Sequence, residues 1–240
     1  MLSEVLSKMW QANIFTIFPD AFPGNLGVSV IGKALEKKIW NLNVIDLKRF
    51  PVKNDRIDST PCGGGVGMVL SPITFQKAFD TLPKEEQKKR KIYFSPRGRQ
   101  LKQKDLEDIS QSDGVTILCG RYEGVDQRIL DYYEMEEVSI GDFVLLGGEA
   151  AAMTILEGCV RLLPCVVGNH SSIDDDSFQN NLLEHNQYTL PQEFNEMKVP
   201  KVLLGGNHNE IKEFRTNQSK NITKKLRPDL WAKYIEENLK

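Results

Sequence analysis

Glycine, arginine and carboxylate residues gather in three short stretches, each directly after a run of β-forming residues. They are SPRGRQ after KIYF, GRYEGVDQR after TILC, and GDFVLLGGE after EEVSI. If the runs are parallel strands, their carboxyl ends meet at one edge of a sheet, where α/β proteins bind ligands. One such loop is usually only a connection between elements. Three in the same part of the chain predict a single shared pocket, in which glycine lets the backbone approach a ligand closely.

The third stretch contains an apolar tetrad, FVLL, at residues 143–146. Gly141 precedes it, and Gly147 and Gly148 follow it. Read alone, this pattern predicts a buried strand with a turn at each end. Beside the other two stretches, it is interpreted as one wall of a ligand cradle.

Two further glycine-rich segments admit a functional and a structural interpretation. PCGGGVGM, at residues 61–68, either wraps an anion with its backbone amides or forms a mobile hairpin or loop tip, and composition leaves both open. GVSVIGKA, at residues 27–34, fits the spacing of a phosphate-binding loop through Lys33. Ala34 replaces the Ser or Thr that holds magnesium there, so a helix beginning near Val28 is favoured.

An arginine and an acidic run flank a segment without periodicity. Arg161 lies in RLLP near the end of an apolar helical pattern, and three aspartates occupy residues 174–176. The pair could act as a base and a charge stabiliser, or both could simply be solvated. Spacing alone does not decide between these alternatives.

Strand-like runs alternate with segments of helical periodicity, which predicts βα units and a parallel sheet. The predicted strands are NIFTIF, LNVIDL, KIYFS, GVTILCG and EEVSIG, at residues 13–18, 42–47, 91–95, 114–120 and 136–141. Helices are predicted at residues 71–82, 99–111, 125–133 and 148–164, the first with Ser71 as N-cap and the last ending at Pro164.

The chemistry of the chain changes after this last helix. Residues 165–181 are rich in Gly, Asn, Ser and Asp, which is typical of a linker. Asn207, with Glu210 three residues later, then predicts a helix start, and residues 227–239 predict a final amphipathic helix. We therefore expect an α/β domain at residues 1–165, a linker at 166–176 and a helical domain at 177–240.

Composition is that of an ordinary soluble globular protein, with 40% hydrophobic and 27% charged residues. No apolar run approaches a membrane span, and no secretory leader is recognisable at the start, so a cytoplasmic location is expected. Cys62, Cys119, Cys159 and Cys165 form no CxxC pair, which favours buried thiols over a zinc site or disulfides. Residues 198–240 carry 10 Lys and Arg against 5 Asp and Glu, whereas residues 1–197 carry 21 against 28.

Eight motifs, in their order and spacing, resemble the bacterial tRNA (guanine-N1)-methyltransferases of the TrmD family. They are IFTIFPDAF, DSTPCGGGVGM, YFSPRGR, LCGRYEGVDQR, SIGDFVLLGGE, the alanine-rich helix with RLLP, DDDSF and VPKVLLGGNHNEI. The resemblance covers residues 14–230. The GRYEG and SIGDFVL motifs are specific enough to make a chance match implausible.

The resemblance implies a SPOUT-class fold, an α/β domain with a parallel sheet and a C-terminal deep trefoil knot, joined to a small helical domain. It also implies a homodimer with the active site at the subunit interface, a tRNA partner, and neither a membrane nor a DNA partner. S-adenosylmethionine would lie in the knot. The residues expected to bind this cofactor are Tyr93, Phe94, Ser95, Pro96, Gly120, Glu123, Gly124, Ile140, Gly141, Asp142, Phe143, Val144, Leu145, Gly147 and Gly148.

In the family, the residue matching Asp176 is the general base and the one matching Arg161 stabilises the developing charge. The guanine is at tRNA position 37, beside the anticodon. Residues expected to contact RNA are Gly63, Gly64, Gly65, Lys212, Arg215 and Lys220. A magnesium requirement is also implied, with Glu123 as a candidate, but the sequence shows no ligand set.

Two kinds of alternative remain. One is a SPOUT-fold protein that only binds RNA, or that methylates another RNA position. The other is a phosphate-loop nucleotide hydrolase based on GVSVIGKA, which the missing Ser or Thr disfavours.

Overall fold

The structure is a computed structural model that describes residues 9–52, 54–167 and 177–238. The chain divides into two compact units, Met1–Gly168 and Asn169–Lys240. No described helix is both long and apolar enough to cross a membrane.

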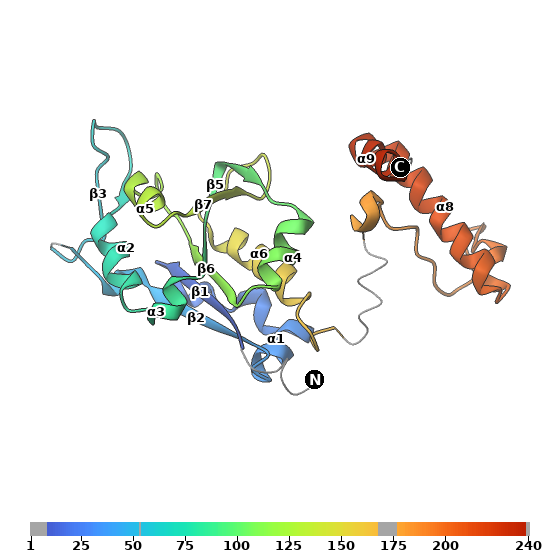
Figure 1. The fold of residues 1–240 in the computed structure, drawn as a ribbon, viewed down its shortest axis with the longest axis horizontal. Coiled ribbons are helices and arrows are strands. Elements are labelled where there is room, and N and C mark those ends of the chain that lie inside the picture. The colour runs from blue at the N-terminus through green and yellow to red at the C-terminus, as the bar shows by residue number, and fades with distance from the viewer. Residues whose placement is uncertain (1–8, 53, 168–176, 239–240) are drawn as a thin grey trace. The chain divides into compact units, whose positions relative to one another are not determined.

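The first unit is built on a five-stranded sheet of order β2-β1-β6-β5-β7 (Figure 1). All neighbouring strands in it are parallel. The strands are β1 (Trp10–Thr16), β2 (Trp40–Asp46), β5 (Arg90–Gln100), β6 (Gly114–Leu118) and β7 (Glu136–Ser139). The expected parallel α/β sheet is therefore confirmed, although β1 begins three residues earlier than the pattern NIFTIF predicts.

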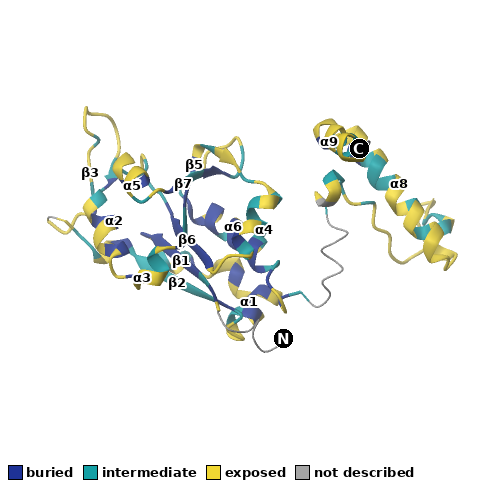
Figure 2. Cartoon of the chain, in the orientation of Figure 1, coloured by how far each residue is buried: buried dark blue, intermediate teal, exposed yellow. Residues whose placement is uncertain are grey.

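Helices cover both faces of this sheet, as the continuous apolar runs in its strands require (Figures 1 and 2). On one face, β1 and β6 pack against α1 (Ser29–Glu36), α4 (Gln103–Ser110) and α6 (Glu149–Val160). On the other face lie α2 (Pro72–Phe79) and α5 (Gln127–Tyr132), where Phe15 is in ring contact with Phe75 and Phe79. Central strand β6 is buried along its whole length.

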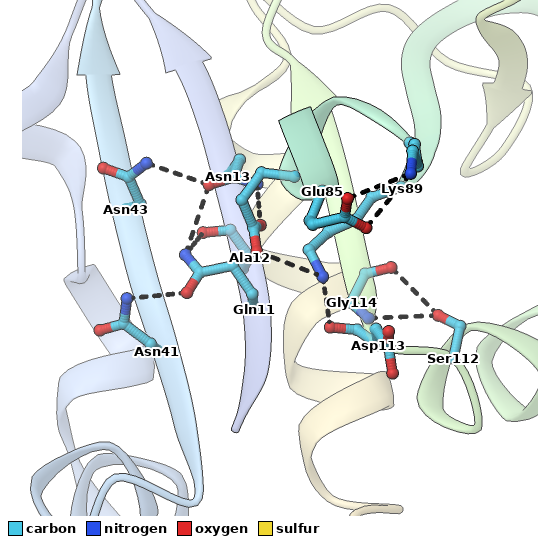
Figure 3. A network of polar contacts seen from close by, with 12 residues as sticks. Gln11, Ala12, Asn13, Asn41, Asn43, Glu85, Lys89, Ser112, Asp113 and Gly114 are labelled. Carbon is cyan, nitrogen blue, oxygen red and sulfur yellow. Dashed lines mark hydrogen bonds and ion pairs between the residues drawn. The ribbon is translucent and has the colours of Figure 1, made fainter. Parts of the chain in front are cut away.

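The amino ends of the strands carry a polar network beneath α3 (Lys84–Gln87) (Figure 3). The Asn13 side-chain amide donates to Glu86 at 2.9 Å, and its oxygen accepts from Asn43 at 3.0 Å. Lys89 donates to the carbonyl of Asp113 at 2.8 Å. These hydrogen bonds join β1, β2, β6 and the segment of α3, so they hold the layers together at this end of the sheet.

Strand β5 continues through SPRGRQ, where the sequence pattern predicts a loop after the strand. Phe94 and Arg99 both pair with Val138 of β7, so the four residues between them form a bulge. Gly98 permits this geometry because a side chain there would collide with the backbone of Val138 and Glu137. The helix expected at residues 99–111 consequently starts later, at Gln103, where the Asp105 carboxylate accepts from the Lys102 amide at 2.9 Å.

The expectation that residues 143–146 form a buried strand is wrong. Strand β7 ends at Ser139, and the following residues form an exposed loop. Val144 and Leu146 are 83% and 91% exposed. A run of four apolar residues does not reveal by itself whether other elements cover it.

The other helices begin close to their predicted positions, but α6 is shorter than predicted. α1 follows Val28, and α2 begins at Pro72 after Ser71. α6 ends at Val160 instead of Pro164, because Leu162 and Leu163 donate to carbonyls three residues back and tighten the last turn. Shorter 3-10 helices occur at η1 (Pro19–Ala21), η2 (Gly24–Gly27) and η3 (Leu47–Arg49).

The glycine-rich segment at residues 61–68 is the tip of a hairpin. Strand β3 (Asp58–Ser59) pairs antiparallel with β4 (Val69–Leu70) at its base. Of the four cysteines, all free thiols, Cys62 in this tip and Cys165 are exposed, and only Cys119 and Cys159 are buried as expected.

The second unit consists mainly of α8 (His208–Leu226) and α9 (Pro228–Asn238). The Asn207 side chain accepts from the amides of Asn209 and Glu210 and donates to the Glu210 carboxylate, so the expected helix start is confirmed. The unit also contains η4 (Gln179–Asn181), the hairpin of β8 (Glu193–Phe194) and β9 (Met197–Lys198), and η5 (Lys201–Leu204).

Candidate functional site

A cavity of about 590 Å³ opens at the carboxyl ends of β5, β6 and β7. The β5 bulge, the loop after β6 and the loop after β7 line it together, so the expected convergence of three loops on one pocket is found. All the residues expected to bind the cofactor, except Asp142, lie on its wall. These three strands are neighbours in the sheet, and the chain crosses from β6 over β5 to β7. Such a crossing point is where open α/β sheets bind ligands.

Tyr93 forms the floor of the cavity between two glycines. A side-chain carbon at Gly120 would lie 2.8 Å from the Tyr93 ring, and one at Gly124 would lie 3.1 Å from its hydroxyl oxygen. Burial raises the pKa of Tyr93, and the nearby Glu137 carboxylate raises it further. The phenol is therefore neutral at physiological pH and remains a hydrogen-bond donor.

The glycines of the loop after β7 make room for other parts of the protein. A side chain at Gly148 would lie 2.9 Å from the Cys119 backbone, and one at Gly147 would collide with the Arg121 side chain. Gly141 has a φ of +154°, and a side chain there would collide with the Phe143 ring. The glycines thus allow the loops to pack against each other, and this packing shapes the cavity.

The outer rim of the cavity is apolar and exposed. Phe143, Val144, Leu145 and Leu146 lie on the loop after β7, and each is at least 44% exposed. Tyr122, on the loop after β6, is 57% exposed. Exposed apolar groups gathered at a cavity are typical of a surface that a ligand or partner covers.

The hairpin tip contacts the cavity at one point. A side chain at Gly67 would overlap the Glu123 side chain, and the Glu123 amide donates to the Met68 carbonyl at 3.0 Å. By contrast, Gly63, Gly64 and Gly65 have positive φ and only open space around them. The base of the hairpin is therefore fixed against the cavity wall, and its tip projects away from neighbours.

The two expected catalytic residues are not brought together by the described part of the chain. Arg161 is half-buried and is the C-cap residue of α6. It does not line the cavity, which α6 reaches at the opposite end through Gly148 and Ala151. Asp176 lies outside the described residues, as do the two aspartates before it.

No group of three or more His, Cys, Asp or Glu side chains that could hold a metal ion is found among the described residues. Glu123, the candidate from the sequence, lies against Gly67 at the cavity wall. A magnesium site needs several oxygen ligands in octahedral geometry. Glu123 is the one carboxylate among the described residues that line the cavity, so further ligands there would come from water, backbone or substrate oxygens.

A second cavity, of about 810 Å³, lies within the second unit. Its lining includes the expected RNA contacts Lys212 and Arg215, together with His208, Thr216 and Ser219. Lys220, also expected to contact RNA, has its ammonium 5.6 Å from the centre of the ring of Tyr234, which lines this cavity. Cations and hydroxyl groups in one concave surface are suited to binding phosphate.

Sequence reasoning missed two residues, Arg121 on the wall of the first cavity and Glu149, its ion-pair partner. The Arg121 guanidinium forms an ion pair with the Glu149 carboxylate at 2.9 Å. Glu149 is 3% exposed and begins α6. The sequence does contain a signal for Glu149: it is a lone acid at the start of a long apolar helix, and a helix N-terminus stabilises negative charge.

Comparison with known proteins gives a consistent result. The family model described as "tRNA (Guanine-1)-methyltransferase TrmD" matches residues 10–233. Proteins named tRNA (guanine-N(1)-)-methyltransferase are similar along nearly their whole length. The protein from Ruegeria pomeroyi is 48% identical, with 95% of each chain covered. The one from Roseobacter denitrificans is 49% identical, with 95% of this chain and 96% of the relative covered. The one from Pelagibacter ubique is 48% identical, with 94% of this chain and 99% of the relative covered.

Proposed function

Because this chain belongs to the TrmD family of tRNA (guanine-N1)-methyltransferases, we propose that it methylates N1 of the guanine at tRNA position 37, with S-adenosylmethionine as methyl donor. The observation that carries the proposal is the convergence of three loops on one cavity at the carboxyl ends of β5, β6 and β7. The reaction belongs in the cytoplasm, where tRNA is modified.

The cavity suits a cofactor that has a polar heterocycle, a sugar and a charged tail. Its volume of about 590 Å³ falls within the range of roughly 300–1,000 Å³ typical of small-molecule sites. Residues of all three loops line the cavity, and Phe94, Ile140 and Leu145 provide apolar walls. When bound, S-adenosylmethionine supplies a methyl group activated by its sulfonium.

The protein must prepare guanine N1 for methylation, because this nitrogen carries a proton and its lone pair is delocalised in the ring. We assign proton removal to Asp176 and stabilisation of the negative charge that spreads to O6 to Arg161, as the family resemblance implies. Alignment of N1 with the methyl group is then a matter of positioning. No step is assigned to magnesium, since no group of three or more ligating side chains is found among the described residues.

We propose that Arg161 acts at the cavity of a second copy of the chain in a homodimer. α6 contributes Ala151 to the cavity, ten residues before Arg161, so about 15 Å of helix separates the two in the same chain. The exposed apolar loop at residues 143–146 supports a second copy as the covering surface. We therefore propose a homodimer whose active site includes residues of both subunits, which a molecular mass measured in solution would test.

A knotted topology is part of the same proposal. The loop after β7 passes the end of β5 and returns beside the loop after β6, where Gly148 donates to the Gly120 carbonyl at 3.0 Å and Arg121 pairs with Gly147. This path supports a threaded SPOUT connection. The small helical unit at residues 177–240 is proposed to bind tRNA through Lys212 and Arg215, with Gly63, Gly64 and Gly65 of the hairpin tip as further contacts.

Methyl transfer by Asp176→Asn tests the catalytic assignment. The wild-type protein, given S-adenosylmethionine and unmodified tRNA with guanine at position 37, should incorporate methyl groups, and Asp176→Asn should lower the rate by at least about 100-fold. Cofactor and tRNA binding should change little. An Asp176→Asn variant with wild-type activity would contradict the role of Asp176.

The same assay separates the alternatives. A tRNA with adenine at position 37 should accept no methyl group. Methylation of that tRNA would indicate another RNA position, and cofactor binding without methylation of any tRNA would indicate a protein that only binds RNA.

A further inference from the structure

A buried carboxylate joins two segments that are far apart in the sequence, directly behind the cavity wall. Glu149 is 3% exposed, and Thr16 at the end of β1 donates to its Oε1 at 2.7 Å. Arg121 donates to its Oε2 from Nε at 3.0 Å, and Nη2 forms an ion pair with the same oxygen at 2.9 Å. Burial of a carboxylate is costly unless an opposite charge and hydrogen bonds compensate for the lost contact with water. Both of its oxygens are therefore committed to Thr16 and Arg121.

The Arg121 end of this ion pair contacts the cavity wall. The Arg121 backbone pairs with Gly147, and its Nη1 donates to the Leu146 carbonyl at 3.4 Å. The space that a Gly147 side chain would need is filled by the Arg121 side chain. Arg121 thus holds the last residues of the loop after β7 in their position along the cavity.

Phe18 restricts both the Arg121 guanidinium and the Thr16 hydroxyl. The Arg121 guanidinium lies 4.5 Å from the centre of the Phe18 ring, a cation–π contact that restricts its rotamer. The Thr16 hydroxyl also accepts from the Phe18 amide at 2.9 Å. The arrangement has few alternative geometries, because each polar atom already has a partner.

We propose that Thr16, Arg121 and Glu149 form a positioning unit that holds the wall at residues 146–148 in place and thereby sets the affinity for S-adenosylmethionine. None of the three is proposed to act on the reacting atoms. The inference rests on the proposed function, because it takes the cavity to be the cofactor site. The positioning unit explains why an arginine, Arg121, occurs in GRYEG and why a glutamate, Glu149, follows Gly147 and Gly148.

Calorimetric titration of the full-length protein with S-adenosylhomocysteine, a non-reactive analogue, tests this inference. Glu149→Gln keeps the shape but removes the charge, and Arg121→Lys keeps the charge but removes the two-point contact. Both should raise the Kd by at least about tenfold. In turnover, the KM for S-adenosylmethionine should rise in parallel, while the KM for tRNA stays within about twofold.

Glu136→Gln is the matched control. Glu136 accepts two hydrogen bonds from Arg90, at 2.6 and 2.7 Å, near the amino end of the sheet. Its loss should lower the melting temperature yet leave the Kd within about twofold. If Glu149→Gln and Arg121→Lys bind the analogue as Glu136→Gln does, the positioning role is wrong and the ion pair is only structural.

Thr16→Val removes a single hydrogen bond and keeps the branched shape, so it decides the question if either charged variant fails to fold. Its Kd should rise about threefold, and an unchanged Kd would overturn the proposal. Wild-type protein that does not bind the analogue would instead overturn the assignment of the cofactor site, and with it this inference.

Discussion

At the residue scale, Gly141 illustrates why glycine is needed beside the cavity. The Phe143 ring occupies the space that a Cβ at this position would need. The Ser139 hydroxyl donates to the Gly141 carbonyl at 3.0 Å and accepts from its amide at 3.2 Å, which closes a tight turn after β7. A side chain at Gly141 would therefore displace Phe143 and open this turn, and both belong to the cavity wall.

We expect Gly141→Val to raise the Kd for S-adenosylmethionine by at least about tenfold, because a β-branched residue is strained at this φ and collides with Phe143. The Kd for tRNA should change by less than about twofold. Gly206→Val, at another positive φ but in open space, is the matched control. A larger effect on tRNA than on the cofactor would mean that Gly141 serves only the turn.

At the element scale, one network of charges fixes both ends of β5 around its bulge. Arg90 at the start of the strand and Arg99 after the bulge both contact Glu136 of β7. Arg99 also contacts Asp105 of α4 at 2.8 Å. The network therefore ties β5, β7 and α4 together.

The pH dependence of stability should report this network. Hydrogen bonds from Arg90 lower the pKa of Glu136. Burial would raise the pKa of Asp105, but hydrogen bonds from Arg99 and from the Lys102 amide outweigh it, so that pKa is also lowered. Carboxyls with a lower pKa in the folded state add stability above their unfolded pKa of about 4, and this is lost as the pH falls through the folded pKa.

We therefore expect Glu136→Gln to be less stable than the wild type by about 1 kcal/mol at pH 7, after allowance for solvent screening of this partly exposed pair. The difference should shrink as the pH is lowered from roughly 5 to 2, because the wild-type carboxyl is protonated there. Urea unfolding at a series of pH values measures it. A difference that does not change with pH would show that packing, and not charge, accounts for the loss.

At the scale of the whole molecule, charge is divided between the two units. Residues 198–240, which include α8 and α9, carry 10 basic against 5 acidic side chains, and residues 1–197 carry 21 against 28. A polyanion such as tRNA would be attracted to the basic part. Lys212 and Arg215 in the second cavity are candidates for direct contacts with its phosphates.

Loss of the Lys212 and Arg215 side chains from the second cavity should weaken tRNA binding and also reduce the salt dependence of that binding. For Lys212→Ala/Arg215→Ala we expect the slope of log Kd against log salt concentration to fall by about 1 to 2, as for the loss of two phosphate contacts. The Kd for S-adenosylmethionine should be unchanged. Lys233→Ala, which removes a charge of the same unit outside the second cavity, is the control. An unchanged slope in the double variant would place the RNA contact elsewhere.

Local sequence patterns were enough to predict the fold class, one helix start and the family of this protein. The alternation of strands and helices predicted a parallel α/β sheet, Asn207 with Glu210 predicted a helix start, and the motifs identified the family. Three loops after successive strands predicted a shared pocket, because parallel strands bring their carboxyl ends to one edge. Each of these features depends on residues close in sequence or on the general geometry of a sheet.

Only the tertiary structure decided which groups meet at the cavity. β5 continues past its expected end because β7 offers a second pairing register, and the FVLL loop is exposed because no described element covers it. Thr16 and Glu149 are 133 residues apart in the sequence and bond because β1 and α6 come together in the folded chain. Long-range contacts of this kind follow from strand order and layer packing, which no local periodicity encodes.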